Sequence, residues 1–255
     1  MSDAAADVPV RDAATVVLLR DGEAGVETWL LTRVTALDFA AGMSVFPGGR
    51  VDDGDADLPV SGAVTAAAAF AADEAAARTL VGAAVRETFE ETGVLLTVPP
   101  AELPDAVADV EQRRIAFGDL LREHGLAVDA AALRPWSRWI TPRGETRRYD
   151  TRFFVAALPE GATARDLTTE SSRADWVPVA EAIEQGQRGE RRLLPPTMLT
   201  LVSLAGHATV ADALAAASGR SLEPVRPTLH AGEDGSVSVD LPDGRRIPIS
   251  PGHAS

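Results

Sequence analysis

Three glutamates close together constrain this chain more than any other feature. Glu87, Glu90 and Glu91 stand at positions i, i+3 and i+4, ahead of a helix stop at Gly93. On a helix, residues with this spacing share one face. Three carboxylates this close repel one another unless a cation lies among them. A divalent ion such as Mg²⁺ takes oxygen ligands and leaves positions for water and substrate phosphates, so the pattern predicts a metal site for a diphosphate substrate.

The surrounding motifs decide between this interpretation and a plain solvated helix face, which is common in acidic chains. Phe46-Pro47-Gly48-Gly49 precedes the glutamates, and the helix ends as Arg86-Glu87-Thr88-Phe89-Glu90-Glu91-Thr92-Gly93-Val94. Together the two segments resemble the Nudix hydrolase family, whose signature is Gly-x5-Glu-x7-Arg-Glu-aliphatic-x-Glu-Glu-x-Gly-aliphatic. The resemblance implies an α/β fold, the Nudix fold, with a mixed β-sheet sandwiched between helices. It also implies Mg²⁺ or Mn²⁺ held by Glu87, Glu90, Glu91 and the Gly49 carbonyl.

The signature is interrupted in this chain. Asp55 fits the first acidic position, but the family then reaches its arginine after eight positions, whereas Arg86 follows Asp55 by 31. The insertion, roughly residues 56–78, is rich in alanine and is therefore expected to be helical. A second register remains open, in which Arg78 takes the first acidic position and Asp73 or Glu74 supplies the acid.

An insertion at this point is similar to the branch of the family that includes coenzyme A and acyl-CoA diphosphatases. That branch implies CoA or acyl-CoA as the substrate, with ADP-ribose, NADH or a nucleotide sugar as alternatives. A non-catalytic ligand-binding regulator with the same fold is a further alternative. Substrate contacts are expected from five arginines: Arg33, Arg50, Arg143, Arg147 and Arg148.

Two further roles follow from the resemblance and from simple chemistry. Arg86 is expected to orient the carboxylates through charge-assisted hydrogen bonds, because an arginine is too strongly basic to accept a proton. Nudix enzymes often use an additional glutamate from a loop as metal ligand or general base, and Glu170 is the candidate here. Trp136 and Trp139 are either core residues or a stacking surface for adenine, and large aromatic residues favour the core.

The expected domain organisation has one catalytic domain with additions. A helical excursion, with its pattern broken near Gly118, is expected to cover the active site or to form the contact of a homodimer. A hairpin around Asp243-Gly244 closes the sequence. The expected parts are a flexible N-terminus at 1–11, a Nudix domain at 12–205 containing the insertion 56–78 and the helical excursion 101–135, and a C-terminal extension at 206–255 packed on the core.

Composition excludes several classes of function. A formal net charge of −14 repels nucleic acid polymers. No apolar run approaches the roughly 20 residues that a membrane span needs. The chain has no cysteine, so disulfides are excluded, and its acidic first residues do not resemble a signal peptide. A cytoplasmic enzyme acting on a small diphosphate is therefore expected.

Overall fold

The computed structural model describes most of the chain. The described residues are 8–34, 41–168, 171–231, 237–240 and 246–249. No helix in these ranges is long and apolar enough to cross a membrane.

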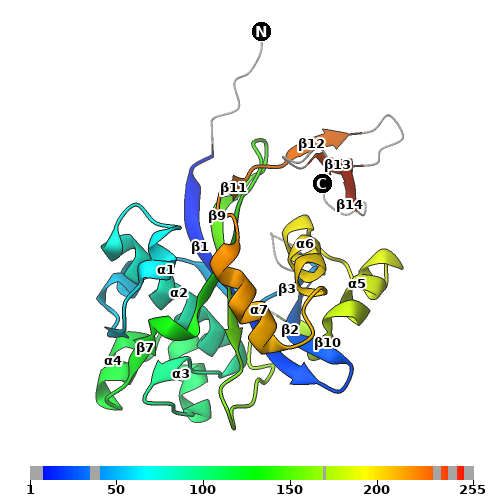
Figure 1. The fold of residues 1–255 in the computed structure, drawn as a ribbon. Coiled ribbons are helices and arrows are strands. Elements are labelled where there is room, and N and C mark those ends of the chain that lie inside the picture. The colour runs from blue at the N-terminus through cyan, green and yellow to red at the C-terminus, as the bar shows by residue number, and fades with distance from the viewer. Residues whose placement is uncertain (1–7, 35–40, 169–170, 232–236, 241–245, 250–255) are drawn as a thin grey trace.

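A mixed eight-stranded sheet forms the centre of the molecule (Figure 1). The order is β10-β2-β1-β9-β8-β11, with β3 beside β2 and β4 beside β1. Pairing is antiparallel except between β1 and β9 and between β8 and β11. The strands are β1 (Val10–Gly22), β2 (Gly25–Arg33), β3 (Ser44–Val45), β4 (Gly48–Arg50), β8 (Arg134–Ile140), β9 (Arg148–Ala157), β10 (Ser171–Pro178) and β11 (Pro224–Val225).

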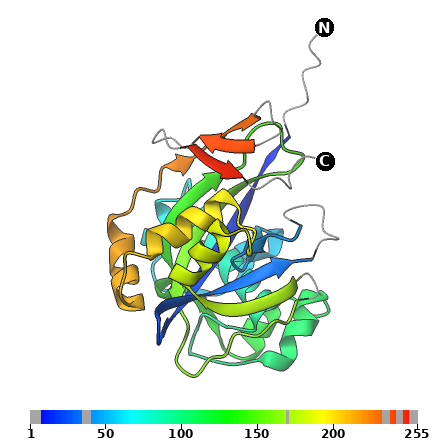
Figure 2. The same ribbon diagram turned by 90° about the vertical axis from the view of Figure 1, so that its right-hand side faces the viewer.

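Helices cover both faces of this sheet, which confirms the predicted sandwich. Helices α1 to α4 lie on one side and α5 and α6 on the other, as Figures 1 and 2 show from two directions. The helices are α1 (Thr65–Ala68), α2 (Glu74–Thr92), α3 (Val107–Glu111), α4 (Phe117–Glu123), α5 (Val179–Gln187), α6 (Pro195–Leu204) and α7 (Val210–Ala216), with 3₁₀ turns η1 (Asp53–Asp57), η2 (Pro104–Ala106), η3 (Ala130–Ala132) and η4 (Ala217–Gly219).

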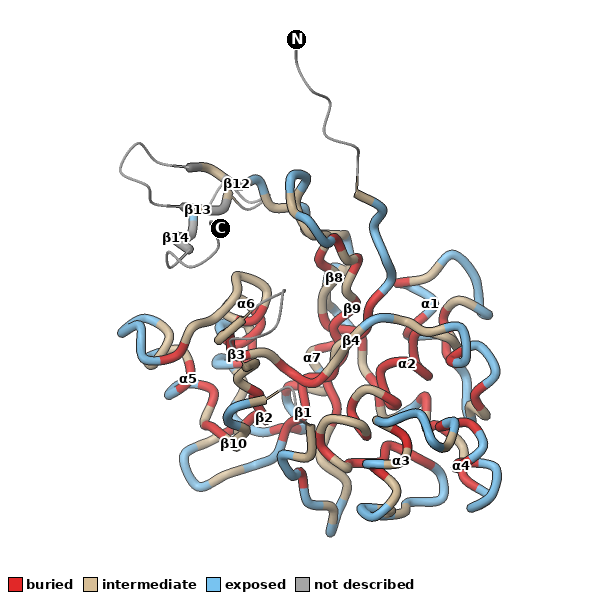
Figure 3. The backbone as a smooth tube through the Cα atoms, turned by 180° about the vertical axis from the view of Figure 1, so that it is seen from behind, coloured by how far each residue is buried: buried red, intermediate tan, exposed pale blue. Residues whose placement is uncertain are grey.

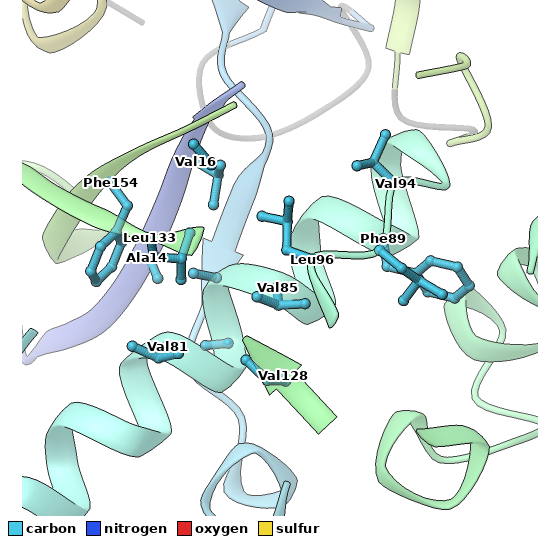
Figure 4. Packing of buried hydrophobic residues seen from close by; sticks show 14 of the residues in the cluster. Ala14, Val16, Val81, Val85, Phe89, Val94, Leu96, Val128, Leu133 and Phe154 are labelled. Carbon is cyan, nitrogen blue, oxygen red and sulfur yellow. The ribbon is translucent and has the colours of Figure 1, made fainter. Parts of the chain in front are cut away.

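The central strand β1 supplies side chains to two cores, because successive residues of a strand point to opposite faces. Ala14 and Val16 pack against Val81 and Val85 of α2 (Figure 4). Val17 belongs to the second core, with residues of α5, α6 and α7. The buried segments therefore run through the sheet and through α2, as the burial colouring in Figure 3 shows.

A fork between β1 and β2 positions the paired glycines. β2 pairs with β1 as far as Thr28 and further on pairs with β3, at Leu31 and Thr32. β4 occupies the space that opens, and its Gly49 pairs with Ala14 of β1. The segment from β3 to β4 therefore lies between the two diverging strands.

The insertion is less helical than its alanine content predicts. Within residues 56–78, the α-helical segments are the four-residue α1 and the beginning of α2. Between them, Phe70 turns inward, is 1% exposed and packs edge-on against Phe154 at 5.5 Å between ring centroids. Burial of this aromatic ring outweighs the helix propensity of its alanine neighbours, which contributes little energy per residue.

The excursion at 101–135 also differs from its prediction. The helical pattern breaks at 112–116, where Arg113 adopts a positive φ of 56°, and Gly118 lies inside α4. A Cβ on Gly118 would lie 3.2 Å from the Leu58 side chain, so glycine there allows close packing. The segment also contributes β7 (Ala127–Asp129), which pairs with β5 (Val60–Ser61) and β6 (Thr97–Val98). Val94 to Val98 is rich in aliphatic residues, as strands are, but β6 has only two residues.

The segment before β1 joins the sheet earlier than the sequence predicts, and the first part of the C-terminal extension packs on the core. Val10 and Arg11 already pair with β9, so the expected flexible segment is too long by these residues. Beyond residue 205, α7 packs in the second core and β11 extends the sheet. The expected C-terminal hairpin strands are present and form a separate sheet of β12 (Thr228–Ala231), β13 (Val237–Asp240) and β14 (Arg246–Ile249).

Candidate active site

Helix α2 carries the glutamate cluster in its last two turns. Its first turn is capped by the Asp73 carboxylate, which accepts a hydrogen bond from the Ala76 N–H at 2.8 Å. It ends at Gly93, whose left-handed φ of 74° favours glycine. Carboxylates at the C-terminal end of a helix face the negative end of its dipole, so this cluster needs nearby positive charge.

Arg86 supplies that charge and connects the two halves of the interrupted signature. Its Nε donates to Asp55 Oδ1 at 2.7 Å and its Nη2 to Asp55 Oδ2 at 3.0 Å. The Asp55 side chain is only 1% exposed and also accepts the Asp52 N–H. Nη2 also donates to the Arg50 carbonyl at 3.0 Å. The pairing brings η1, β4 and α2 together.

The same guanidinium also contacts two of the glutamates. Nη1 of Arg86 donates to Glu87 at 2.8 Å and to Glu90 at 3.2 Å. Burial raises the pKa of Glu87 to about 7, and the Glu90 charge adds to the shift while Arg86 opposes it. Burial also raises the pKa of Glu90, again against the effect of Arg86. For Arg86, burial by itself would lower the pKa, but Asp55 and the glutamates raise it overall.

The paired glycines lie directly against this cluster. Gly48 donates its N–H to Glu91 Oε2 at 2.9 Å. A Cβ on Gly49 would lie 2.6 Å from the Glu87 carboxyl carbon, so a side chain there would displace the carboxylate. Gly48 is equally restricted, since a Cβ would lie 2.5 Å from the Ala14 carbonyl. The glycines therefore let the backbone approach the carboxylates closely.

The donors in this region suit a hard divalent cation. Carboxylate and carbonyl oxygens are the ligands that Mg²⁺ and Mn²⁺ prefer. For Glu87 and the Gly49 carbonyl to bind the same ion, the two residues must lie close together. Glu87 does lie directly against Gly49. In the described residues, however, no group of three or more His, Asp or Glu side chains is arranged to hold a metal ion unaided. Arg86 contacts Glu87 and Glu90, and Glu91 is tied to Gly48.

The second register of the signature does not bring its residues to this cluster. Asp73 caps the other end of α2, and Glu74 is exposed beside it. Arg78 donates to the Val60 carbonyl at 2.8 Å. Of the acids considered for the first position, the one in contact with Arg86 is Asp55.

The arginines predicted to contact the substrate differ in their exposure and in their contacts. The Arg50 side chain pairs with Asp52 at 2.9 Å and is half exposed. Arg143 and Arg147 are exposed in the loop between β8 and β9. Arg148, also expected to contact the substrate, is buried in β9 and donates to the Thr141 carbonyl at 3.2 Å.

The register of β1 shows how far Arg148 lies from the glycines. Arg148 pairs with Val10, whereas Gly49 pairs with Ala14, which is about 13 Å further along the strand. Arg33 ends β2 and bonds through its N–H to the Met43 carbonyl at 3.0 Å. Glu170 lies outside the described residues.

The structure adds two arginines that the sequence analysis missed. Arg113 pairs with Asp52 at 2.8 Å, and its charge opposes the raised pKa of Glu90. Arg191 is 5% exposed and bonds to Asp175 and to Ser44 Oγ. Both lie far from the signature along the chain, and no motif marks them.

The tryptophans are part of the core. Trp136 is 0% and Trp139 is 6% exposed, which confirms the core interpretation and excludes an adenine-stacking surface in this conformation. The Trp136 indole donates to Ser203 Oγ at 2.9 Å, and the Arg220 guanidinium lies 3.8 Å from its ring centroid.

Comparisons with known proteins agree with this geometry. The family model of the NUDT19 Nudix domain matches residues 60–204. Acyl-coenzyme A diphosphatase NUDT19 of Gallus gallus is 32% identical over 198 residues, 66% of this chain and 52% of that protein. The protein of the same name in Homo sapiens is 34% identical over 178 residues, 61% of this chain and 48% of that protein. The chain thus spans about half the length of these curated relatives.

A solved structure extends the likeness to nearly the whole chain. The NUDIX hydrolase from Alicyclobacillus acidocaldarius superposes with a TM-score of 0.71 at 30% sequence identity. The match covers 85% of this chain and 99% of that one. Together with the glycine pair, the Asp55–Arg86 contact and the glutamate helix, these matches show that the chain belongs to the Nudix hydrolase family.

Proposed function

We propose that this protein hydrolyses the diphosphate of CoA or acyl-CoA in the presence of Mg²⁺ or Mn²⁺, giving 3′,5′-ADP and (acyl-)phosphopantetheine. The observation that carries the proposal is the network in which Arg86 joins Asp55 to Glu87 and Glu90 beside the paired glycines. The substrate class is supported by the relatives named acyl-coenzyme A diphosphatase.

The metal would be held by Glu87, Glu90, Glu91 and the Gly49 carbonyl. Substrate oxygens and water would complete the ligand set, as is usual for Mg²⁺ in proteins. When bound, the ion neutralises the diphosphate and lowers the pKa of water.

The residues of the chain have distinct tasks in this reaction. Water attacks one phosphorus, the other phosphate leaves, and a carboxylate takes the proton from the water. One of the three glutamates or Glu170 is that base. Arg86 touches two of the candidates, so it fixes their orientation while Asp55 fixes Arg86.

Product analysis by mass spectrometry tests the function directly. CoA, acetyl-CoA, NADH, ADP-ribose and UDP-glucose are each incubated with the protein and Mg²⁺ or Mn²⁺. We expect phosphopantetheine chiefly from the CoA compounds and no product in excess EDTA. Turnover of another diphosphate would keep the chemistry and replace the substrate. Absence of turnover for every compound would favour the non-catalytic regulator.

A double variant tests the site. Glu90→Gln with Glu91→Gln keeps the side-chain shape and removes two charges, so we expect loss of nearly all activity. Glu74→Gln is the matched control, since Glu74 is exposed at the other end of the same helix. Full activity in the double variant would overturn the proposed site. A cytoplasmic location and a homodimer remain predictions from the sequence.

A further inference from the structure

Arg192 lies beside the segment that leads to the paired glycines. Its carbonyl accepts the Ser44 N–H at 2.8 Å, and Ser44 and Leu193 form a parallel bridge. The chain at 192–193 therefore adds to β3, whose last residue lies three positions before Gly48.

The direction of the Arg192 side chain follows from this pairing. Bridged residues of parallel strands point to the same face, and neighbours along a strand alternate. Leu193 packs with the core of α5 and α6, on the same side as Phe46. Val45, between Ser44 and Phe46, packs against the core of α2. Arg192 precedes Leu193 and therefore points to the α2 face of the sheet.

Arg33 reaches the same face from the other side of β3. Leu31 packs in the α2 core, and Arg33 follows it by two positions on the same strand. Its N–H bonds to the carbonyl of Met43, just before β3. Two spacings between strands separate Arg33 from Arg192, about 10 Å. Glu91 lies on the same face of the sheet, because it is in the last turn of α2 and accepts a hydrogen bond from the Gly48 N–H.

Arg192 differs from the neighbouring Arg191 in its lack of an acidic partner among the described residues. Its neighbour Arg191 is fully engaged with Asp175 and Ser44. The Arg192 side chain is half-buried, and among the described residues no hydrogen bond or ion pair reaches it. In a chain with a net charge of −14, a half-buried guanidinium without an acidic partner indicates an anionic ligand. We infer that Arg192, with Arg33, binds a phosphate group of the substrate, an inference that rests on the proposed diphosphatase function.

The experiment compares Arg192→Gln with Arg188→Gln. Arg188 is in the same connection before α6, but it is exposed and already paired with Glu190. We expect Arg192→Gln to raise KM for CoA by about tenfold or more with little change in kcat, since hydrogen bonds to charged groups contribute that much. Arg188→Gln should behave as wild type, and both variants should keep the wild-type melting temperature.

Dephospho-CoA identifies which phosphate is bound. An equal rise in KM for CoA and dephospho-CoA assigns Arg192 to the diphosphate, and a rise for CoA alone assigns it to the 3′-phosphate of the ribose. Unchanged KM for both compounds overturns the inference.

Binding of inorganic pyrophosphate separates this inference from the proposed function. If the wild-type protein cleaves neither CoA compound, the proposed function fails. Calorimetry with pyrophosphate and Mg²⁺, and separately with 3′,5′-ADP, then decides about Arg192, because the two compounds carry the diphosphate and the 3′-phosphate respectively. Weaker binding of either compound to Arg192→Gln than to Arg188→Gln supports the inference, and equal or undetectable binding of both compounds overturns it.

Discussion

Arg86 holds Asp55 with two hydrogen bonds although the two residues lie 31 positions apart. Both side chains are nearly excluded from solvent, with exposed fractions of 10% and 1%. A buried ion pair is not strongly stabilising in itself, but removal of one partner leaves an uncompensated charge. The contact therefore fixes the position of η1, where the insertion begins, relative to α2, which carries the glutamates.

Asp55→Asn is expected to destabilise the protein. The amide leaves the Arg86 guanidinium without its main counter-charge, so the free energy of unfolding in urea should fall by about 3 kcal/mol or more. The control is Asp53→Asn in the same 3₁₀ turn, because Asp53 is exposed. Equal stability of the two variants would contradict the structural role of Asp55.

Arg86→Lys should lower activity more than it lowers stability. An ammonium cannot reach Asp55, Glu87, Glu90 and the Arg50 carbonyl together in the planar fork that arginine provides. We expect kcat to fall by roughly a hundredfold, a magnitude typical of misplaced catalytic groups. Arg78→Lys on the same helix is the control, and a comparable loss there would show that the effect is not specific to the cluster.

Gly49→Ala should abolish most of the activity in a folded protein. The added methyl group would occupy the place of the Glu87 carboxylate, which must then move away. Circular dichroism checks the fold, and initial rates with CoA and Mg²⁺ check the function. Gly54→Ala serves for comparison, because its Cβ would meet no atom within 4 Å. Wild-type rates in Gly49→Ala would show that Glu87 is not needed at that place.

The stability of the metal-free protein should depend on pH through Glu87. Burial raises its pKa from 4.5 to about 7, so the folded protein binds this proton more tightly than the unfolded chain. The contribution is complete below about pH 4.5 and is lost as the pH rises through about 7. Its size is at most about 3 kcal/mol. Urea unfolding in EDTA should show this decline in the wild type and a smaller one in Glu87→Gln, and parallel curves would contradict it.

The sequence predicts those parts of the molecule that depend on local spacing. The face shared by the three glutamates and the helix stop at Gly93 both follow from periodicity and turn residues. Asp55 could be assigned to the first acidic position because the signature requires an acidic residue near its start. Its burial under Arg86 could not be predicted, since that depends on how the insertion folds.

Contacts between distant segments explain the remaining differences. Phe70 ends α1 by packing on Phe154, and alanine content carries no information about that contact. In the sequence Arg148 follows other basic residues, but in the structure β9 begins at Arg148 and its guanidinium donates to the carbonyls of Thr141 and Val8. Arg191 and Arg192 gain their positions by pairing with β3, which lies nearly 150 residues earlier.

The interrupted signature also bears on how such proteins diversify. Asp55 and Arg86 are joined by their own contact, whereas the chain between them has both buried side chains, such as Phe70, and exposed stretches at 61–63 and 72–73. The entropic cost of closing a loop grows slowly, by about 0.6 kcal/mol for each doubling of its length. Insertions and deletions in these exposed stretches can therefore accumulate over evolution with little loss of stability. Residue spacing is then a poor guide to this active site, and a search by three-dimensional template would recognise it more dependably.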